Sequence, residues 1–261
     1  MSLAAKRLAA VLIAVPIALT GCSSAGEKPA PSGAASTSSA GPLAGLKAGQ
    51  EVDKAVFFAA TKAVADTTKT YTFSTLVGPD GTVAKSTGLV DNTDPADPKR
   101  QATITSEAGT ESVLIVGGKV YSKVDAENGG KYVVSALTPE LKATLGASAR
   151  VDQKQDVTSK VVFVGEEELG GTKVRHFTLT TTTPGASPPA SAGTATATPT
   201  VGQLDYWLDE SNRPRKLQHT VDGVLSVTTY DKWGDKVTIT APTADQILSE
   251  TPAATPAPTA S

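Results

Sequence analysis

The sequence predicts an α+β fold, a curved antiparallel β half-barrel of about ten strands with helices covering its concave face. Consecutive alternating segments are separated by turns of a few residues, which is typical of an antiparallel meander and not of βαβ units. Threonine and valine are abundant, and β-branched residues favour strands. A long meander twists and curls, and one long amphipathic segment is available to pack on its concave face. A plain sandwich with that helix along one edge is the alternative.

The N-terminus carries the features of an exported protein in the expected order. Lys6 and Arg7 precede the apolar run Leu8–Leu19, which is shorter than the roughly 20 residues that a membrane-spanning helix needs. The following sequence, Leu19-Thr20-Gly21-Cys22, resembles the lipobox of bacterial lipoproteins. The resemblance implies that residues 1–21 are a lipoprotein signal peptide and that Cys22 is lipidated and begins the mature protein. The alternative is an ordinary signal peptide followed by an unrelated or buried structural cysteine.

Lipidation at Cys22 would make the cell membrane a partner of this chain. Two or three acyl chains hold a protein on a membrane far better than one chain does, so we expect an extracytoplasmic protein anchored to the outer face of the cell membrane. Cys22 is the only cysteine, so no disulfide within the chain is expected. The formal net charge of −2 argues against a nucleic-acid partner.

Composition divides the remaining chain into a folded domain and its flanks. Residues 22–49 are rich in Ser, Ala, Gly and Pro and predict a flexible linker, and residues 249–261 predict a disordered tail for the same reason. Residues 50–248 predict one domain. Within it, residues 183–200 form a low-complexity insertion that is expected to be an exposed loop.

The first element of the domain is predicted to be a helix over Glu51–Lys69. No Gly or Pro interrupts this segment, and Phe57 and Phe58 widen its apolar face. That face is expected to pack on the sheet. Its members recur at spacings of three and four residues: Val52, Ala55, Val56, Ala59, Ala60, Ala63 and Val64.

Most of the later segments are predicted strands. A short helix is expected from Thr138, which can act as the N-cap, to about Leu145, because Pro139 suits the first helical position and Gly146 would end it. Ala244–Leu248 predicts one helical turn. The strand-like segments, in order, are Tyr71–Val77, Thr82–Val90, Arg100–Ser106, Glu111–Val116, Lys119–Val124, Lys131–Val134, Ser159–Glu168, Thr172–Thr182, Gly202–Asp209, Arg215–Val221, Gly223–Tyr230 and Lys236–Thr240.

The sequence shows no machinery for catalysis, and no cofactor or metal is expected. His176 and His219 have no acidic residue or Cys at ligand spacing and are interpreted as strand residues. No G-x-S-x-G or H-E-x-x-H motif is present. The aspartates of Asp91–Asp97 lack the Gly and Glu of a calcium loop, and Glu166–Glu168 is interpreted as a solvated strand end. We therefore expect a protein that is not an enzyme.

A family resemblance rests on the lipobox-like sequence and on four segments near the C-terminus of the domain, namely Asp205–Asp209, Asn212–Leu217, Tyr230–Asp235 and Ala241-Pro242. With these features, the chain from about Gln50 to Leu248 resembles the actinobacterial lipid-carrier lipoproteins of the LppX/LprG type, which share a fold with the LolA/LolB carriers. The resemblance implies a curved half-barrel closed by helices, with an apolar cavity for the acyl chains of a lipid or glycolipid, used for transport or sensing. The 183–200 insertion and the proline-rich tail have no counterpart in the family pattern.

The small residues of the predicted helix favour an apolar void under it. Alanine fills less volume than Leu or Ile, and empty apolar space accepts apolar ligands, although alanine can also simply bring helix and sheet closer together. The alternative function is a regulatory or scaffolding module that binds an envelope protein partner and carries no lipid. The candidate cavity-lining residues, each of which can equally be plain core, are Val56, Phe57, Ala59, Tyr71, Phe73, Leu114, Val116 and Leu204.

Overall fold

The computed structural model describes residues 41–147, 158–183, 200–221 and 223–248. The signal peptide, Cys22, nearly all of the 183–200 insertion and the 249–261 tail lie outside these residues, so the expectations about them stay predictions. Within the described ranges, no helix is long and apolar enough to cross a membrane.

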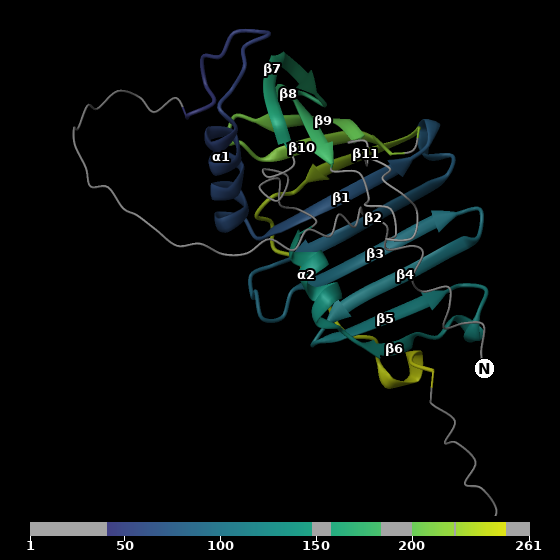
Figure 1. The fold of residues 1–261 in the computed structure, drawn as a ribbon. Coiled ribbons are helices and arrows are strands. Elements are labelled where there is room, and N and C mark those ends of the chain that lie inside the picture. The colour runs from purple at the N-terminus through teal and green to yellow at the C-terminus, as the bar shows by residue number, and fades with distance from the viewer. Residues whose placement is uncertain (1–40, 148–157, 184–199, 222, 249–261) are drawn as a thin grey trace, which may run out of the picture.

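An 11-stranded antiparallel sheet forms the body of the described chain (Figure 1). This confirms the prediction of an antiparallel sheet of about ten strands. The strands are β1 (Thr70–Val77), β2 (Ala84–Asp91), β3 (Lys99–Ser106), β4 (Gly109–Val116), β5 (Lys119–Val124), β6 (Val133–Ala136), β7 (Thr158–Leu169), β8 (Thr172–Thr183), β9 (Thr200–Asp209), β10 (Pro214–Val221) and β11 (Val224–Asp231).

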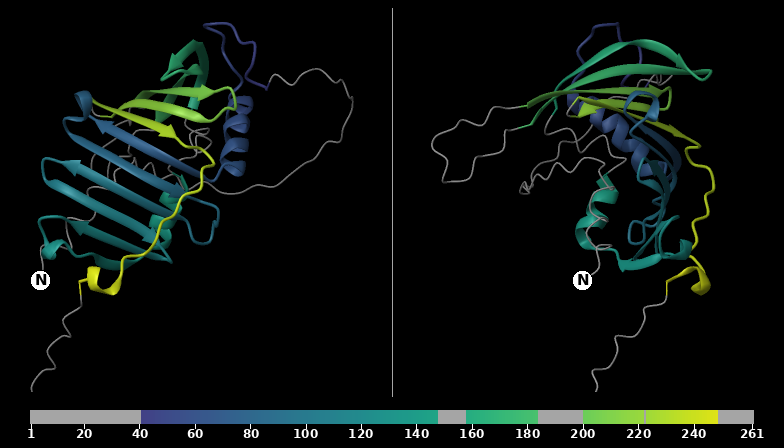
Figure 2. Two further views of the ribbon diagram at one scale, coloured as in Figure 1. Left: turned by 180° about the vertical axis from the view of Figure 1, so that it is seen from behind. Right: turned by 90° about the vertical axis from the view of Figure 1, so that its right-hand side faces the viewer.

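The sheet consists of two meanders joined at their chain ends. Its spatial order is β6-β5-β4-β3-β2-β1-β11-β10-β9-β8-β7, so the first strand and the last strand pair at the centre. The register of this junction aligns Phe73 with Tyr230 and Thr75 with Thr228. The edge strands β6 and β7 do not pair, and the sheet stays open. Figure 2 shows the sheet bending toward the side on which the helices lie.

Among the described residues there are two α-helices, α1 (Lys54–Thr67) and α2 (Pro139–Ala147). Asp53 caps α1, because its Oδ1 accepts hydrogen bonds from the backbone N–H groups of Ala55 and Val56, at 2.7 and 3.1 Å. The predicted cap of α2 is confirmed, since the Leu141 N–H donates to Thr138 Oγ1 at 3.2 Å. The helix continues through Gly146, which was expected to end it.

The two open edges of the sheet are partly covered by the chain itself. Residues 49–52 run along β7, where the Gly49 and Val52 N–H groups donate to the carbonyls of Phe163 and Val161. At the other edge, Tyr132 exchanges backbone hydrogen bonds with Gln246 and Leu248. Covered edges do not offer a template for pairing with another chain.

The ordered domain begins before residue 50. Leu43 lies inside the segment predicted as linker, yet it is fully buried and packs in the same cluster as Phe57 and Phe177. Leu46, in the same segment, packs against this cluster as well, but two leucines in a stretch of small residues and proline were too weak a signal to move the predicted boundary.

The prediction of a strand over Lys236–Thr240 was wrong. Residues 236–240 pair with no strand and run across the convex side of the sheet (Figure 2), where Ile239 packs on Leu114 and Tyr121. Both edges of β11 are already occupied by β1 and β10, so a segment that follows β11 after a short turn has no strand to pair with.

Candidate functional site

The strand register decides which side chains line the concave, inner face. Cross-strand partners point to the same face of a sheet. Tyr71, Val90, Arg100 and Ile115 are successive partners across β1 to β4 and therefore share one face. Ile115 belongs to a cluster that includes Leu141 of α2, so this is the face on which α2 lies.

The other meander places aromatic side chains on the same inner face. Phe163, Phe177, Tyr206 and Leu217 are successive partners across β7 to β10. Phe57 of α1 packs on them, with ring centroids 5.1 Å from Phe177 and 6.2 Å from Tyr206. Each helix therefore contacts a different end of the inner face.

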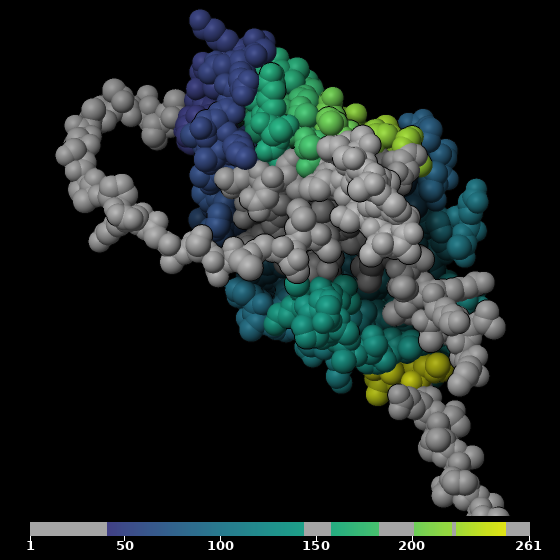
Figure 3. All heavy atoms as spheres, viewed as in Figure 1, coloured from purple at the N-terminus to yellow at the C-terminus, as the bar shows by residue number. Residues whose placement is uncertain are grey.

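Among the described residues, the inner face carries two separate buried clusters. The α1 cluster is centred on Phe57, Phe58, Phe163 and Phe177, and the α2 cluster is formed by Val113, Ile115 and Val120 with partly buried neighbours. In the space-filling view, α1 and α2 lie apart on the same side of the molecule (Figure 3). A domain usually has one contiguous core, so a core divided into two clusters is unusual. We therefore take the strands between the clusters, β11, β1 and β2, as the candidate binding site.

An aromatic group occupies one end of these central strands. The rings of Tyr71 and Trp233 lie 4.6 Å apart, and that of Tyr230 lies 5.8 Å from Tyr71 and 6.0 Å from Trp233. Trp233 is held by a hydrogen bond of 2.9 Å from its Nε1 to the carbonyl of Pro214. Burial raises the pKa of the Tyr71 and Tyr230 phenols, so both hydroxyls stay protonated at neutral pH.

Arg100 adds a positive charge beside this aromatic group. It is half-buried on the inner face, and its Nε is out of contact with solvent. Burial lowers the pKa of Arg100, and the nearby phenols of Tyr71 and Tyr230 oppose that shift. Arginine nevertheless remains charged at neutral pH.

The floor between the aromatic group and the α2 cluster is made of small residues. Gly88 and Ala102 are cross-strand partners on the inner face of β2 and β3. Phe73 lies over Gly88, where an added Cβ would come within 2.6 Å of its ring and 2.3 Å of the Gln101 carbonyl oxygen. Glycine at this position therefore lets the Phe73 ring lie against the sheet.

Four of the eight predicted cavity residues lie on the inner face. Phe57 is fully buried and Tyr71 is buried, while Phe73 and Leu204 are half-buried. These four do not all touch, because Phe57 and Leu204 belong to the α1 cluster and Tyr71 and Phe73 lie in the central strands. Sequence reasoning missed Arg100, Tyr230 and Trp233 as site residues. The latter two stand in the quoted Tyr230–Asp235 segment, which was the available signal.

The other four predicted residues lie elsewhere. Leu114 and Val116 point to the convex, outer face, where they pack in the same cluster as Ile239. Val56 is 38% exposed, and Ala59 is also exposed, because α1 buries a different face from the one that spacing indicated. Its buried residues are Phe57, Phe58, Ala60 and Thr61.

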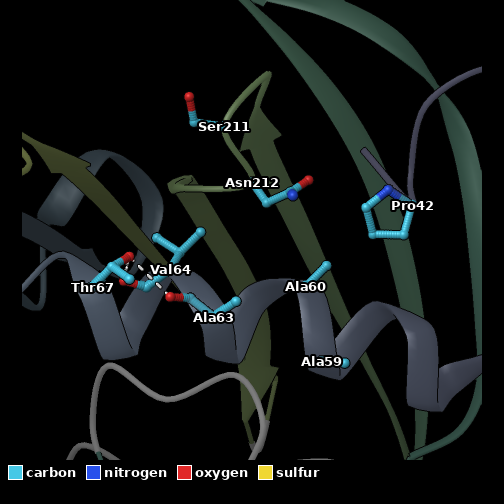
Figure 4. A pocket seen from close by; sticks show the side chains of 8 residues that line it. All are labelled: Pro42, Ala59, Ala60, Ala63, Val64, Thr67, Ser211 and Asn212. Atoms are coloured by element: carbon cyan, nitrogen blue, oxygen red, sulfur yellow. Dashed lines mark hydrogen bonds between the residues drawn. The ribbon is translucent and has the colours of Figure 1, made fainter. Parts of the chain in front are cut away.

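Ala59 instead lines an open groove of about 460 Å³ between α1 and the turn that joins β9 to β10 (Figure 4). Small α1 side chains form one wall, and Ser211 and Asn212 form the other. Four of the lining residues are alanine or valine, which gives the groove a mostly apolar surface. Its full lining is Pro42, Ala59, Ala60, Ala63, Val64, Thr67, Ser211 and Asn212.

The sequence suggested that His176 has no acidic neighbour, but the structure places it in a polar network on the outer face. Its Nδ1 is 2.8 Å from Glu167 and its Nε2 is 3.3 Å from Asp205. The ring stacks on Trp207 at 4.2 Å, and the Trp207 Nε1 donates to Glu167 at 2.9 Å. Glu167 is thus bonded rather than simply solvated. Both ring nitrogens therefore face carboxylates in this arrangement.

Within the described ranges, no group of three or more His, Cys, Asp or Glu side chains is placed to hold a metal ion. Trp207 lies among His176, Glu167 and Asp205: its ring stacks on His176, and its Nε1 donates a hydrogen bond to Glu167. We therefore interpret this network as a set of side-chain contacts that hold β7, β8 and β9 together on the outer face.

The fold class is therefore an open, curved antiparallel sheet built of two meanders, which meet where the first strand pairs with the last. The sequence matches no protein-family model and no curated protein. Among solved structures, LprF from Mycobacterium bovis is similar at a TM-score of 0.54 and 13% identity, covering 72% of this chain and 96% of LprF. Lipoprotein LppX from Mycobacterium tuberculosis is similar at 0.50 and 14% identity, covering 72% and 98%. The chain has the fold of these two proteins, which confirms the LppX-type resemblance at the level of the fold.

Proposed function

We propose that this chain is a membrane-anchored envelope lipoprotein that binds an amphiphilic lipid or glycolipid on the concave face of its sheet. The anchor is Cys22, which places the domain on the outer face of the cell membrane. In this proposal, α1 and α2 cover the two ends of the concave face, and the acyl chains lie between them along β11, β1 and β2. Binding rests on apolar burial, at about 25 cal/mol per Å², rather than on directional chemistry.

The observation that carries the proposal is the division of the inner face into two clusters. Between them, the inner face of β1, β2 and the adjoining β3 carries mostly aromatic and small side chains, such as Tyr71, Phe73, Gly88 and Ala102, and Val90 is a single aliphatic residue among them. Apolar space that a protein does not fill itself tends to stay dry and to accept apolar ligands. The shared fold with lipoprotein LppX supports the same reading.

Native mass spectrometry of the chain from residue 23 onward, produced in a lipid-bearing host, tests the proposal. We expect a population with extra mass that dissociates as a lipid. A single apo mass, unchanged after incubation with lipid extract, would argue for the alternative, a scaffolding module for an envelope protein.

Neighbouring residues of β3 provide a matched pair of blocking variants. Ala102 points to the inner face and Thr103 to the outer face, since their partners are Gly88 and Val113 for the first and Thr87 and Ser112 for the second. We expect Ala102→Trp to abolish the lipid-bound population and Thr103→Trp to leave it. Ala59→Trp fills the α1 groove, so loss of lipid in that variant alone would move the binding site to the groove.

A further inference from the structure

We propose that Glu111 of β4 binds the primary ammonium group of a lipid head group, such as ethanolamine, at the polar end of the concave face. The acyl chains then extend from Glu111 along the inner face toward Phe73 and Trp233. This inference rests on the proposed function and adds the chemical class of the head group, the residue that selects it and the direction in which the lipid lies.

Glu111 lies in a polar row of side chains that crosses the inner face near one end of the strands. Three hydroxyl groups share this row with the carboxylate. The row of Tyr71, which is largely aromatic and aliphatic, lies four residues or about 13 Å away along β1. The inner face therefore changes from largely apolar to polar along the strands, as a lipid does along its length. The polar row consists of successive cross-strand partners from β11 to β5, namely Thr228, Thr75, Ser86, Ile104, Glu111 and Val124.

The polar row is more accessible than the row of Tyr71. All six of its residues are half-buried, whereas Tyr71, Val90 and Ile115 are only 4%, 0% and 2% exposed. Phe73, in the row between these two, is half-buried, and so is Trp233, whose ring lies against Tyr71. A head group can therefore reach Glu111, while the acyl chains lie over Phe73 and end at Trp233.

The Glu111 carboxylate has no partner of its own within the described ranges. It makes no hydrogen bond or ion pair there, and its two cross-strand partners, Ile104 and Val124, are apolar. Burial raises the pKa of Glu111 through desolvation, and no neighbouring charge offsets this shift. A carboxylate that has lost part of its water gains most from a cation that also donates hydrogen bonds, and a primary ammonium group does both.

The positive side chains around this part of the described chain are placed elsewhere. Among the inward-pointing residues of β1 to β5 and β11, Glu111 is the one acid and Arg100 the one cation. Arg100 pairs with Ile115, four residues or about 13 Å along β4 from Glu111. Lys142 of α2 is engaged with the loop after β2, because its Nζ donates to the Ala96 carbonyl at 2.7 Å. A ligand is therefore the available source of a cation for Glu111.

The hydroxyl groups of the polar row complement the rest of such a head group. The Ser86 hydroxyl makes no hydrogen bond within the described ranges. The Oγ1 atoms of Thr75 and Thr228 lie 2.9 Å apart, so one hydroxyl hydrogen of this pair stays free to donate. These donors suit the phosphate that joins ethanolamine to its lipid. Phosphatidylethanolamine, which has an ammonium and a phosphate in one head group, is therefore the ligand that this row fits.

Trp233 provides a reporter for the far end of the acyl chains. The chain has two tryptophans, and Trp207 is on the outer face, so Trp207→Phe leaves Trp233 as the single emitter beside Tyr71. Bromine on an acyl chain quenches tryptophan only at close contact. Full-length Trp207→Phe protein in non-ionic detergent is titrated with brominated phosphatidylethanolamine, phosphatidylcholine or phosphatidylglycerol, and the concentration for half-quenching is measured.

We expect phosphatidylethanolamine to quench Trp233 at about tenfold lower concentration than phosphatidylglycerol, which has hydroxyls in place of the ammonium, as one charge-assisted contact provides. Phosphatidylcholine, whose ammonium carries no N–H, should fall between them. Glu111→Gln should raise the half-quenching concentration of phosphatidylethanolamine about tenfold and leave phosphatidylglycerol unchanged. Glu111→Asp, which keeps the charge, should retain part of the preference. Glu107→Gln, which removes an exposed acid from the adjoining β3–β4 turn, is the matched control and should change nothing.

Four results would overturn the inference. Equal quenching by phosphatidylethanolamine and phosphatidylglycerol would remove the role of the ammonium while leaving lipid binding intact. A preference that persists in Glu111→Gln would remove the role of Glu111, and its loss in Glu107→Gln would assign it to overall charge. Relief of quenching by free ethanolamine at the concentration of the lipid would assign the site to a soluble amine.

Native mass spectrometry of the same samples separates these failures from a failure of the proposed function. Absence of quenching by every lipid, together with a lipid-bound mass, would overturn the direction in which the lipid lies. Absence of both quenching and lipid-bound mass would contradict the proposed function itself.

Discussion

The two ends of the inner face are built differently. At the α1 end, four phenylalanines and Tyr206 pack ring against ring, and Phe57 and Phe177 are fully buried. At the α2 end, Val113, Ile115 and Val120 form a smaller aliphatic cluster, on which the partly buried Leu141 rests. The difference teaches that α1 is part of the core that holds the sheet together, whereas α2 is attached to a sheet that is already complete.

The largest expected effect is at the α1 end. Phe57→Ala removes a fully buried ring that contacts Phe58, Phe177 and Tyr206, so we expect a loss of roughly 3–5 kcal/mol in the free energy of unfolding. Chemical denaturation measures it. Ile115→Ala, the matched truncation in the α2 cluster, should cost less, about 2–3 kcal/mol. An equal or greater loss in Ile115→Ala would break the comparison.

A smaller effect is expected in α2 itself. Leu141 is half-buried, so Leu141→Ala exposes less apolar surface and should lower the free energy of unfolding by about 1 kcal/mol. Because the helix is then held less firmly over the inner face, we also expect faster exchange of bound brominated lipid, measured as the rate at which Trp233 quenching is lost on dilution. A stability loss as large as that of Phe57→Ala would show that α2 is a core element after all.

The smallest expected effect concerns the turn that carries Trp233 into the central site. The Lys232 N–H, and to a lesser degree the Arg215 guanidinium at 3.0 Å, hold the pKa of Asp231 below its usual range. The contribution of a carboxylate with a lowered pKa is present at neutral pH and is lost as pH falls below about 4, through the lowered value. The Asp231 side chain is 65% exposed, so Asp231→Asn should cost under about 1 kcal/mol at pH 7.

The check on Asp231 is a comparison of unfolding free energies between pH 7 and pH 3. The difference between Asp231→Asn and the unmodified protein should shrink toward the acid end, because the carboxyl becomes protonated as pH falls toward its lowered pKa. Asp80→Asn, in an exposed turn whose backbone Asn can also adopt, is the control and should leave the profile unchanged. A difference at pH 3 as large as the difference at pH 7 would mean that Asp231 acts through packing rather than charge.

Strand positions were predicted well because alternation and turn residues are local signals. The Gly117-Gly118 and Gly170-Gly171 turns, for example, lie where the sequence placed them, and both pairs have positive φ. The buried face of α1 was not predicted. Spacing gave equal weight to every alanine, whereas burial followed the two phenylalanines, whose rings have far more apolar area to remove from water.

The candidate site was harder to predict because it is assembled across long sequence distances. Tyr71 and Phe73 were identified from their alternation. Arg100 was not, because a cation at the start of a strand ordinarily belongs to solvent, and only the register beside Val90 and Ile115 turns it inward. Leu114 and Ile115 show the same difficulty. These adjacent apolar residues point to opposite faces of the sheet, and the sequence does not indicate which of them points inward.

The sequence by itself determined the class of this protein: an antiparallel meander with one long helix before it and one short helix within it, preceded by a lipobox-like segment. These features follow from local propensity, turn chemistry and residue order. Only the tertiary structure decided that β1 pairs with β11, that the two meanders curve around an inner face with two separate clusters, and that Tyr71, Arg100, Tyr230 and Trp233 meet at its end. The physical reason is that strand pairing and burial are contacts between residues far apart in the chain, and no local pattern encodes which edge or face a strand will meet.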